Sequence, residues 1–241
     1  MKRKRVLRRE RQINSKEFPK PSLTAINEFR ENLLKWFTLN GRDYPWRKKS
    51  ATHYQLILAE VLLQRTQAET VKLFWPSFIE TYPSWIQLSK ASEAELQERF
   101  KPIGLWQRRA ASLYLLAQEM NNRRGRFPKD IVEIESLPGV GQYIANAILL
   151  FCHGDPKPLL DSNMARVLER YFGPRILADI RDDPYLQSLA RNIVDCGDAI
   201  FLNWAILDLA ALLCKIKKTS CLDCPLKANC RYANANIEIS Q

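Results

Sequence analysis

The chain has 241 residues, of which 46% are hydrophobic and 26% charged, and its formal net charge is +11. This length and apolar content suffice for one large folded domain or two smaller ones, and they exclude a largely disordered chain. No apolar run approaches the roughly 20 residues that cross a bilayer, and none follows the basic N-terminus as a secretory signal requires. We therefore expect a cytoplasmic protein whose cysteines are thiols or metal ligands.

The positive charge is concentrated at the N-terminus. Residues 1–20 hold nine lysines and arginines against Glu10 and Glu17, a net +7, which leaves +4 for the rest of the chain. Such a segment usually stays disordered and attracts nucleic acid without regard to sequence. We predict a basic, disordered arm over residues 1–22; a solubilising tail without a role is the alternative.

Beyond the arm, apolar residues recur at helical spacing in almost every segment. No run alternates convincingly with period two, and proline and glycine fall between the helical stretches. The predicted fold class is all-α. Helices are expected over residues 26–39, 54 to about 79 (two helices, the second starting near 68 and ending before Tyr82), 91–101, 106–122, 130–136, 142–152, 162–172, 184–196 and 201–214.

A proline–glycine turn, Leu-Pro-Gly-Val-Gly over residues 137–141, separates two of these helices. Pro138 ends the preceding helix, and Gly139 and Gly141 permit backbone angles that other residues avoid. The helix that begins at Gln142 would therefore start with unpaired N–H groups at the positive end of its dipole, which suits a phosphate. The same residues also suit a plain turn between helices.

Asp161 is a single acid in an apolar setting, after Leu159 and Leu160 and before Ser162. The simple interpretation is a cap for the following helix. A carboxylate beside a bound DNA backbone would instead serve chemistry on DNA. The turn and Asp161 together therefore indicate an enzyme that acts on DNA.

Four cysteines lie within 17 residues of one another near the C-terminus, with six, two and five residues between them. Zinc sites usually pair two short Cys-x2-4-Cys knuckles across a longer spacer, and only one close pair is present here. One winding loop can hold all corners of a [4Fe-4S] cluster, which this spacing fits better than the zinc alternative. The predicted ligands are Cys214, Cys221, Cys224 and Cys230.

The turn at 137–141, the downstream Asp161 and the cysteine spacing resemble the helix–hairpin–helix (HhH-GPD) DNA glycosylases of the endonuclease III/MutY superfamily, over about residues 25–232. The resemblance implies a six-helix barrel with the hairpin motif over 49–158. It also implies a second helical domain, built from 23–48 and 159–241, that carries the [4Fe-4S] cluster. The implied partner is double-stranded DNA with a mismatched or damaged base, bound between the domains by a nucleoid-associated monomer.

The resemblance also assigns roles to residues. Asp161 matches the catalytic aspartate, which stabilises an oxocarbenium-like sugar and can activate water. Glu60 matches an acid that protonates a leaving purine or lines a thymine pocket. Bifunctional members carry a lysine at position 143 for Schiff-base chemistry, so Tyr143 implies base hydrolysis without strong AP-lyase activity. The implied DNA contacts are Gln64 as a wedge, Leu105 and Trp106 in an intruding loop, and Leu137, Gly139, Val140, Gly141 and Gln142 in the hairpin.

Two substrate classes compete within the family. Thymine-DNA mismatch glycosylases of the MIG type resemble this chain in Glu60, Tyr143 and the runs 62–66 and 166–173. Adenine-mismatch glycosylases of the MutY type resemble it in Pro45-Trp46, Glu60, Gln64 and the pair Asp161 and Asn163, and some of them also carry a tyrosine at position 143. The MutY type normally adds a C-terminal 8-oxoguanine domain, and we expect none because the sequence ends eleven residues after Cys230. We therefore expect removal of thymine or uracil opposite guanine in base excision repair. Adenine removal is the alternative, and a non-catalytic iron–sulfur DNA-binding protein is an alternative of another class.

Overall fold

The computed structural model describes residues 20–238, in which every regular element is a helix and no strand is present. This confirms the all-α prediction for the described part. Residues 1–19, most of the expected basic arm, lie outside it. No helix in the described part is both long and apolar enough to cross a membrane.

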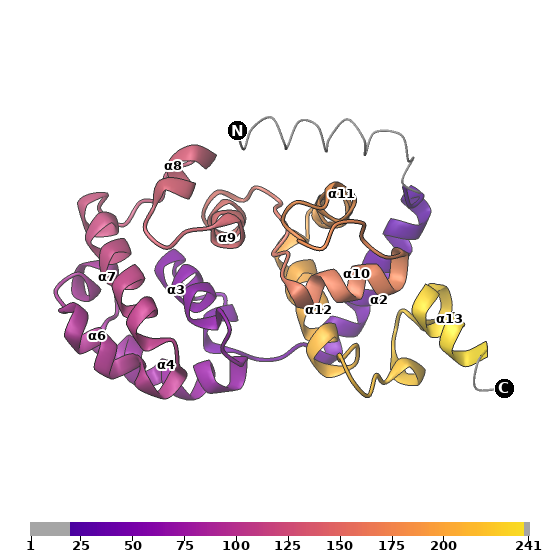
Figure 1. The fold of residues 1–241 in the computed structure, drawn as a ribbon, viewed down its shortest axis with the longest axis horizontal. Helices are drawn as coiled ribbons and strands as arrows, with labels where there is room; N and C mark the ends of the chain where they lie inside the picture. Colours follow the sequence, from indigo (N-terminus) through magenta and orange to yellow (C-terminus); the bar gives the residue numbers. More distant parts are fainter. Residues whose placement is uncertain (1–19, 239–241) are drawn as a thin grey trace.

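The helices form two groups that lie side by side, with α9 (Gln142–His153) between them (Figure 1). The 3-10 turns are η1 (Pro45–Arg47), η2 (Lys101–Ile103), η3 (Cys221–Asp223) and η4 (Lys227–Asn229). The first group holds α3 (His53–Leu63), α4 (Ala68–Thr81), α5 (Trp85–Leu88), α6 (Glu93–Phe100), α7 (Trp106–Asn122) and α8 (Ile131–Ser136). The second holds α2 (Leu23–Asn40), α10 (Ser162–Phe172), α11 (Pro184–Val194), α12 (Ala199–Leu212) and α13 (Arg231–Glu238).

Local signals fix several helix starts. Thr52 and Ser92 each open a helix with a capping box, in which the hydroxyl accepts from the N–H three residues on and that residue's side chain bonds back. Gln55 Oε1 accepts from the Thr52 N–H at 3.0 Å, and Glu95 Oε2 accepts from the Ser92 N–H at 2.7 Å. Because these interactions are between sequence neighbours, the starts of α3 and α6 fall within two residues of their predicted positions.

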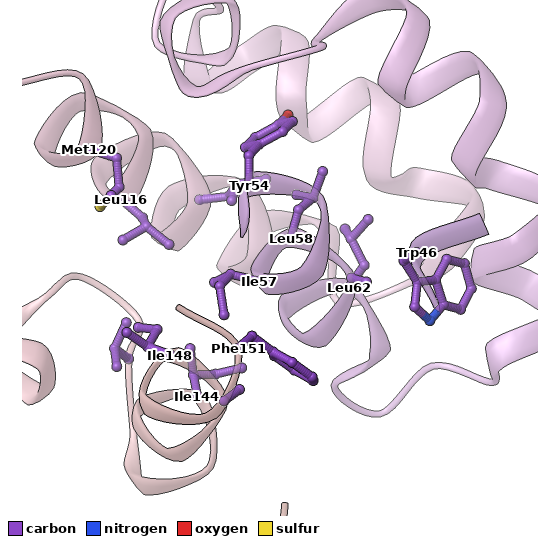
Figure 2. Close-up of a cluster of buried hydrophobic side chains, with 14 of the residues drawn as sticks. Trp46, Tyr54, Ile57, Leu58, Leu62, Leu116, Met120, Ile144, Ile148 and Phe151 are labelled. Atoms are coloured by element: carbon purple, nitrogen blue, oxygen red, sulfur yellow. The ribbon is translucent and has the colours of Figure 1, made fainter. Parts of the chain in front are cut away.

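Each group has its own buried apolar cluster. In the first cluster, side chains of α3 point toward those of α7 and α9 (Figure 2). Ile57 and Leu58 are fully buried there, and burial of such a side chain contributes about 1.5–3 kcal/mol. The second cluster joins α2, α10, α11 and α12. Helix α12 takes part in both, through Ala199 and Trp204 in the first cluster and Leu202 with its neighbours in the second.

A buried carboxylate ties the segment before α3 to α12. Asp208 is fully buried and accepts from the guanidinium groups of Arg42 and Arg47 at 2.8 Å. The Arg47 guanidinium also lies 5.2 Å from the ring centres of both Tyr44 and Trp204. These contacts attach residues 42–47, which lead into the first group, to α12 of the second group.

Helices α11 and α12 end two residues before the predicted positions, because tertiary contacts replace helical hydrogen bonds. The guanidinium of Arg30, on α2, donates to the carbonyls of Asn192 (2.6 Å), Ile193 (2.8 Å) and Asp195 (2.9 Å). Arg166, on α10, likewise donates to the carbonyl of Ala210 near the end of α12 at 3.1 Å. Sequence periodicity carries no information on such long-range donors.

Two helices were not predicted. Helix α5, Trp85–Leu88, has four residues, too few for a periodic pattern to be recognised. Helix α13, Arg231–Glu238, directly follows the last cysteine and has a polar composition. Its packing against α10 supplies an environment that the local sequence does not reveal.

Candidate active site

A cleft of about 550 Å³ lies where the two groups of helices meet, and it brings together residues far apart in the sequence. The residues after α3 and at the start of α7 line one part of it. The hairpin, the start of α9, the segment before α10 and the loop between α10 and α11 line the rest. Of the predicted site residues, Gln64, Leu105, Gly139, Gly141, Gln142, Tyr143 and Asp161 line this cleft.

In the hairpin between α8 and α9, only the backbone conformation and packing of Gly139 require a glycine; those of Gly141 do not. Gly139 has φ +74°, and a Cβ there would lie 2.9 Å from the Cβ of Ser112 on α7. Gly141 has an ordinary extended backbone (φ −108°), so the expectation of unusual angles is wrong at this position. A Cβ on Gly141 would meet open space. Gly139 thus allows close packing on α7, while Gly141 leaves the approach to the cleft open.

Helix α9 begins at the hairpin without a side-chain cap on Gly141. Its first N–H groups have no partners inside the helix, as at any α-helix start. The N-terminus of α9 therefore presents backbone donors and the positive end of a helix dipole beside Gly139 and Gly141, as an anion site requires.

Tyr143 connects the cleft to a buried acid. Tyr143 lines the cleft, and its hydroxyl donates to Glu60 Oε2 at 2.8 Å. Glu60 is 5% exposed and lies behind Tyr143, outside the cleft lining. Burial raises the pKa of Glu60 to about 7, against the Tyr143 hydrogen bond and the positive charge of Arg47, which lower it.

The Tyr143 hydroxyl is held in its protonated form. Burial raises its pKa well above the usual value, and the charges of Glu60 and Asp161 raise it further. Asp161 also raises the pKa of Glu60, so all three groups act on one another electrostatically. Tyr143 is therefore a neutral hydroxyl at the cleft wall, hydrogen bonded to Glu60 and within the electrostatic influence of Asp161.

Asp161 both caps α10 and lines the cleft. Its Oδ1 accepts from the backbone N–H groups of Asn163 and Met164, each at 2.8 Å, and its Oδ2 accepts from Asn163 Nδ2 at 2.7 Å. The two interpretations from the sequence, a helix cap and a carboxylate facing bound DNA, are compatible in the structure. The cap fixes the carboxylate's orientation.

The segment before Asp161 is held by buried amides. The side-chain oxygen of Asn203, on α12, accepts from the Leu159 N–H at 2.7 Å, and its nitrogen donates to the Lys157 carbonyl at 3.1 Å. Asn146, on α9, donates to the Pro158 carbonyl at 2.9 Å. Asp161 is thus positioned relative to α9 and α12 by side chains distant in sequence.

The opposite part of the cleft is organised by Arg109, a residue that sequence analysis did not single out. Its buried guanidinium donates to the carbonyls of Leu62 (2.5 Å) and Gln64 (3.1 Å) and to the hydroxyl of Thr66 (2.8 Å). The Thr66 hydroxyl in turn donates to the Ile103 carbonyl at 3.3 Å. These bonds join the end of α3 to the loop before α7.

Both loops carry a residue with a left-handed backbone. Arg65 has φ +56° and Leu105 has φ +52°, conformations that residues other than glycine rarely adopt. Both line the cleft, and the Leu105 side chain is 50% exposed. The left-handed turns present these side chains at the cleft instead of burying them. Sequence analysis missed four further lining residues, because isolated residues in loops or at a helix start carry no pattern: Arg65, Arg108, Ile180 and Arg181.

Three predicted DNA contacts have side chains directed elsewhere. Leu137 (3% exposed) and Val140 (9% exposed) belong to the first apolar cluster. Trp106 is half-buried against the same cluster, with Lys101 Nζ 5.9 Å from its ring centre. Leu137 and Val140 therefore anchor the hairpin through their side chains, and only their backbone groups are available to a ligand.

The four clustered cysteines lie close together in space. All are half-buried around η3 and η4, and Arg170 on α10 donates to Cys214 Sγ at 3.3 Å. Burial raises the pKa of Cys224 to about 11, and the charges of Cys214, Cys230 and Cys221 add to the rise. Within residues 20–238, no three of His, Cys, Asp and Glu are arranged to hold a single metal ion.

Comparison with known proteins gives the family. Residues 58–177 match the model of the HhH-GPD superfamily of base excision DNA repair proteins. A thymine-DNA glycosylase of Aeropyrum pernix is 38% identical over 87% of this chain and 96% of its own length. The chain belongs to the HhH-GPD superfamily. The thymine/uracil-DNA glycosylase of Pyrobaculum aerophilum is 37% identical over 87% of this chain and 93% of its own length.

The fold of this HhH-GPD protein also matches a solved relative. A thermostable thymine-DNA glycosylase superimposes with a TM-score of 0.79 and 30% identity, over 88% of this chain and 98% of that one. The HhH-GPD match spans the hairpin, Glu60, Tyr143 and Asp161, whereas the four cysteines lie beyond its end. The cleft residues thus belong to the matched region.

Proposed function

We propose that the chain is a DNA glycosylase that removes thymine or uracil mispaired with guanine in base excision repair. The observation that carries the proposal is the cleft itself, where the hairpin, Tyr143 and the capped Asp161 face the same space. The names of the similar proteins from Aeropyrum pernix and Pyrobaculum aerophilum support the choice of base.

The hairpin would bind a DNA phosphate through the backbone N–H groups that begin α9. A base inside a duplex is out of reach, so the target nucleotide must be flipped into the cleft. Gln64 and Leu105 stand on the two loops that Arg109 joins, and we assign them to the space that the flipped nucleotide vacates. The hairpin would contact the phosphate and no base edge, so its binding to DNA is independent of the base sequence.

Asp161 would act on the sugar. As the bond between C1′ and the base nitrogen breaks, its electron pair leaves with the base and the sugar becomes oxocarbenium-like. The negative charge of Asp161, fixed by the bonds to Asn163 and Met164, stabilises that cation. A water oxygen then bonds to C1′ and gives a proton to the carboxylate, and that proton passes on to the departed base anion, which leaves an abasic site, the neutral free base and an ionised Asp161.

Tyr143 and Glu60 would serve the leaving base. While Tyr143 donates to Glu60, its oxygen can accept the N3–H of a thymine or uracil. When Glu60 is protonated, it donates to Tyr143, whose hydroxyl can then donate to a base carbonyl as negative charge develops there. Because the pKa of Glu60 is about 7, both arrangements are populated near neutral pH. Glu60 thus acts through Tyr143 as a positioning residue.

We also propose that Cys214, Cys221, Cys224 and Cys230 hold a [4Fe-4S] cluster in the second of two domains, the first being a six-helix barrel. The donor set fits, since four soft thiol ligands are half-buried close together and a guanidinium donates to one sulfur. When bound, the cluster supplies Fe–S bonds that cross-link the segment between α12 and α13. About four irons per chain are expected in the purified protein; stoichiometric zinc without iron would contradict the assignment.

Excision from a panel of duplexes tests the function. We expect the protein to release base from G:T and G:U duplexes and to leave A:8-oxoguanine, A:G and thymine-glycol duplexes intact. Because position 143 offers no amine, strand breaks should appear only after alkali treatment. Product strands separated with and without alkali measure both properties.

Borohydride gives an independent measure of the chemistry. A Schiff base between protein and sugar would be trapped as a covalent adduct, and we expect none with the G:T duplex. Efficient trapping would refute simple hydrolysis. Release from adenine mismatches alone would instead establish the adenine-specific alternative, and tight duplex binding without any release would establish a non-catalytic role.

A further inference from the structure

The part of the cleft next to Asp161 contains a cation that the mechanism does not use. Arg181, between α10 and α11, lines the cleft together with Ile180, Asp161 and Ser162. Its side chain is 72% exposed. The other arginines that line the cleft are Arg65 in the loop after α3 and Arg108 and Arg109 at the start of α7, and Arg109 donates to backbone carbonyls. Arg181 is therefore the one cation that the loop between α10 and α11 contributes to the described cleft lining.

Arg181 is held in a defined orientation. Its Nε and Nη2 donate to Asp179, with distances of 3.0 Å to Oδ1 and 2.6 Å to Oδ2, and its backbone N–H donates to Oδ1 at 3.0 Å. This planar, two-point pairing restricts the guanidinium while leaving its remaining N–H groups available. The pairing lowers the pKa of Asp179 to about 2, so it persists at every pH of interest.

The loop that carries Arg181 is held in place by hydrogen bonds to a buried carboxylate. Asp183 is fully buried and accepts from the N–H groups of Ile176 (2.7 Å), Leu177 (2.6 Å) and Leu186 (2.7 Å). These bonds tie both ends of the loop to the start of α11. The loop is therefore a rigid support and not a free surface segment.

A second set of bonds links the loop to the hairpin. Gln187 donates to the Ile180 carbonyl at 2.9 Å, and its side-chain oxygen accepts from Gln142 Nε2 at 3.4 Å. Gln142 is the first residue of α9, where the proposed phosphate site begins. The loop that carries Arg181 is thus connected by two hydrogen bonds, through Gln187, to the residue at which that site begins.

We propose that Arg181 binds a backbone phosphate of the strand that carries the flipped nucleotide, with Asp179 as its positioning residue. This inference rests on the proposed DNA-binding function. The sugar that Asp161 acts on is joined to phosphates on both sides, and the carboxylate repels them. A guanidinium on the same side of the cleft offsets that repulsion and binds phosphate oxygens through paired N–H donors.

Salt dependence of binding tests the inference. For Arg181→Ala in the full-length protein we expect roughly tenfold weaker binding to a G:C duplex, which has no base to remove. The slope of log K against log salt should become less steep by about one, as for the loss of one phosphate contact. Anisotropy titrations between 50 and 300 mM KCl measure both quantities. An unchanged affinity and slope would overturn the proposal.

Arg175→Ala is the matched control, because Arg175 lies in the same loop but pairs with Glu169 at 2.8 Å and does not line the cleft. It removes the same charge and should leave the slope unchanged; an equal effect would mean that only net charge matters and would refute the assignment. Base release from the G:T duplex by Arg181→Ala should be slower at limiting protein and near normal at saturation. Absence of release by the unmodified protein would instead refute the proposed function and leave the binding measurement valid.

Discussion

Asp161→Asn is expected to slow base release from a G:T duplex by roughly 10³-fold or more under single-turnover conditions. The substitution removes the negative charge that stabilises the developing sugar cation, an electrostatic contribution of the kind that is usually the largest in a site. Asparagine caps helices as well as aspartate does, so its side-chain oxygen can still accept from the backbone N–H groups of Asn163 and Met164, although the bond from Asn163 Nδ2 is lost. The loss should therefore appear in the rate and not in folding or duplex binding.

Asp130→Asn separates charge at the cleft from the effect of changing a cap. Asp130 caps α8 as Asp161 caps α10, accepting from the N–H groups of Val132 (2.9 Å) and Glu133 (3.1 Å), but it does not line the cleft. Its substitution should leave the rate unchanged. A rate for Asp161→Asn within tenfold of the unmodified protein would contradict the assigned role of Asp161.

Glu60→Gln is expected to stabilise the protein at alkaline pH. The pKa of Glu60 is about 7 in the native state and near 4.5 when the chain unfolds, mainly because burial disfavours the charged form. The native state thus binds the proton more tightly, and the stability that this provides is lost as pH rises from about 4.5 through 7. Glutamine carries no charge at any pH and can still accept from Tyr143. The variant should gain roughly 3 kcal/mol at pH 8.5 and little at pH 4.5.

Urea unfolding of both proteins at the two pH values measures this difference. Glu119→Gln serves as the control, because Glu119 lies on the surface of α7 and pairs with Arg123 at 2.6 Å. It should change stability by less than about 0.5 kcal/mol at either pH. If Glu60→Gln has the same effect at pH 4.5 and 8.5, Glu60 is not protonated by burial in the native protein.

The fold class and most helix positions follow from local sequence, because their causes are local. Periodic apolar residues define α7 and α10, and the prediction for both, 106–122 and 162–172, matches the structure residue for residue. Capping residues next to the helices fix their starts. The predicted helix end is wrong where residues distant in the sequence set it, as at the end of α11, where Arg30 donates to the Asn192 carbonyl.

The sequence by itself determined which chemical groups are present: a glycine-containing turn before a helix, one carboxylate beyond it, a tyrosine and no lysine at position 143, and four clustered thiols. Only the tertiary structure decided how these groups meet. It placed Glu60 behind Tyr143, and it brought Arg109 and Arg181 to opposite sides of the cleft. The physical reason is that burial and charge–charge distance depend on residues far apart in the sequence, such as Arg42 and Asp208, whereas periodicity and caps depend on neighbours.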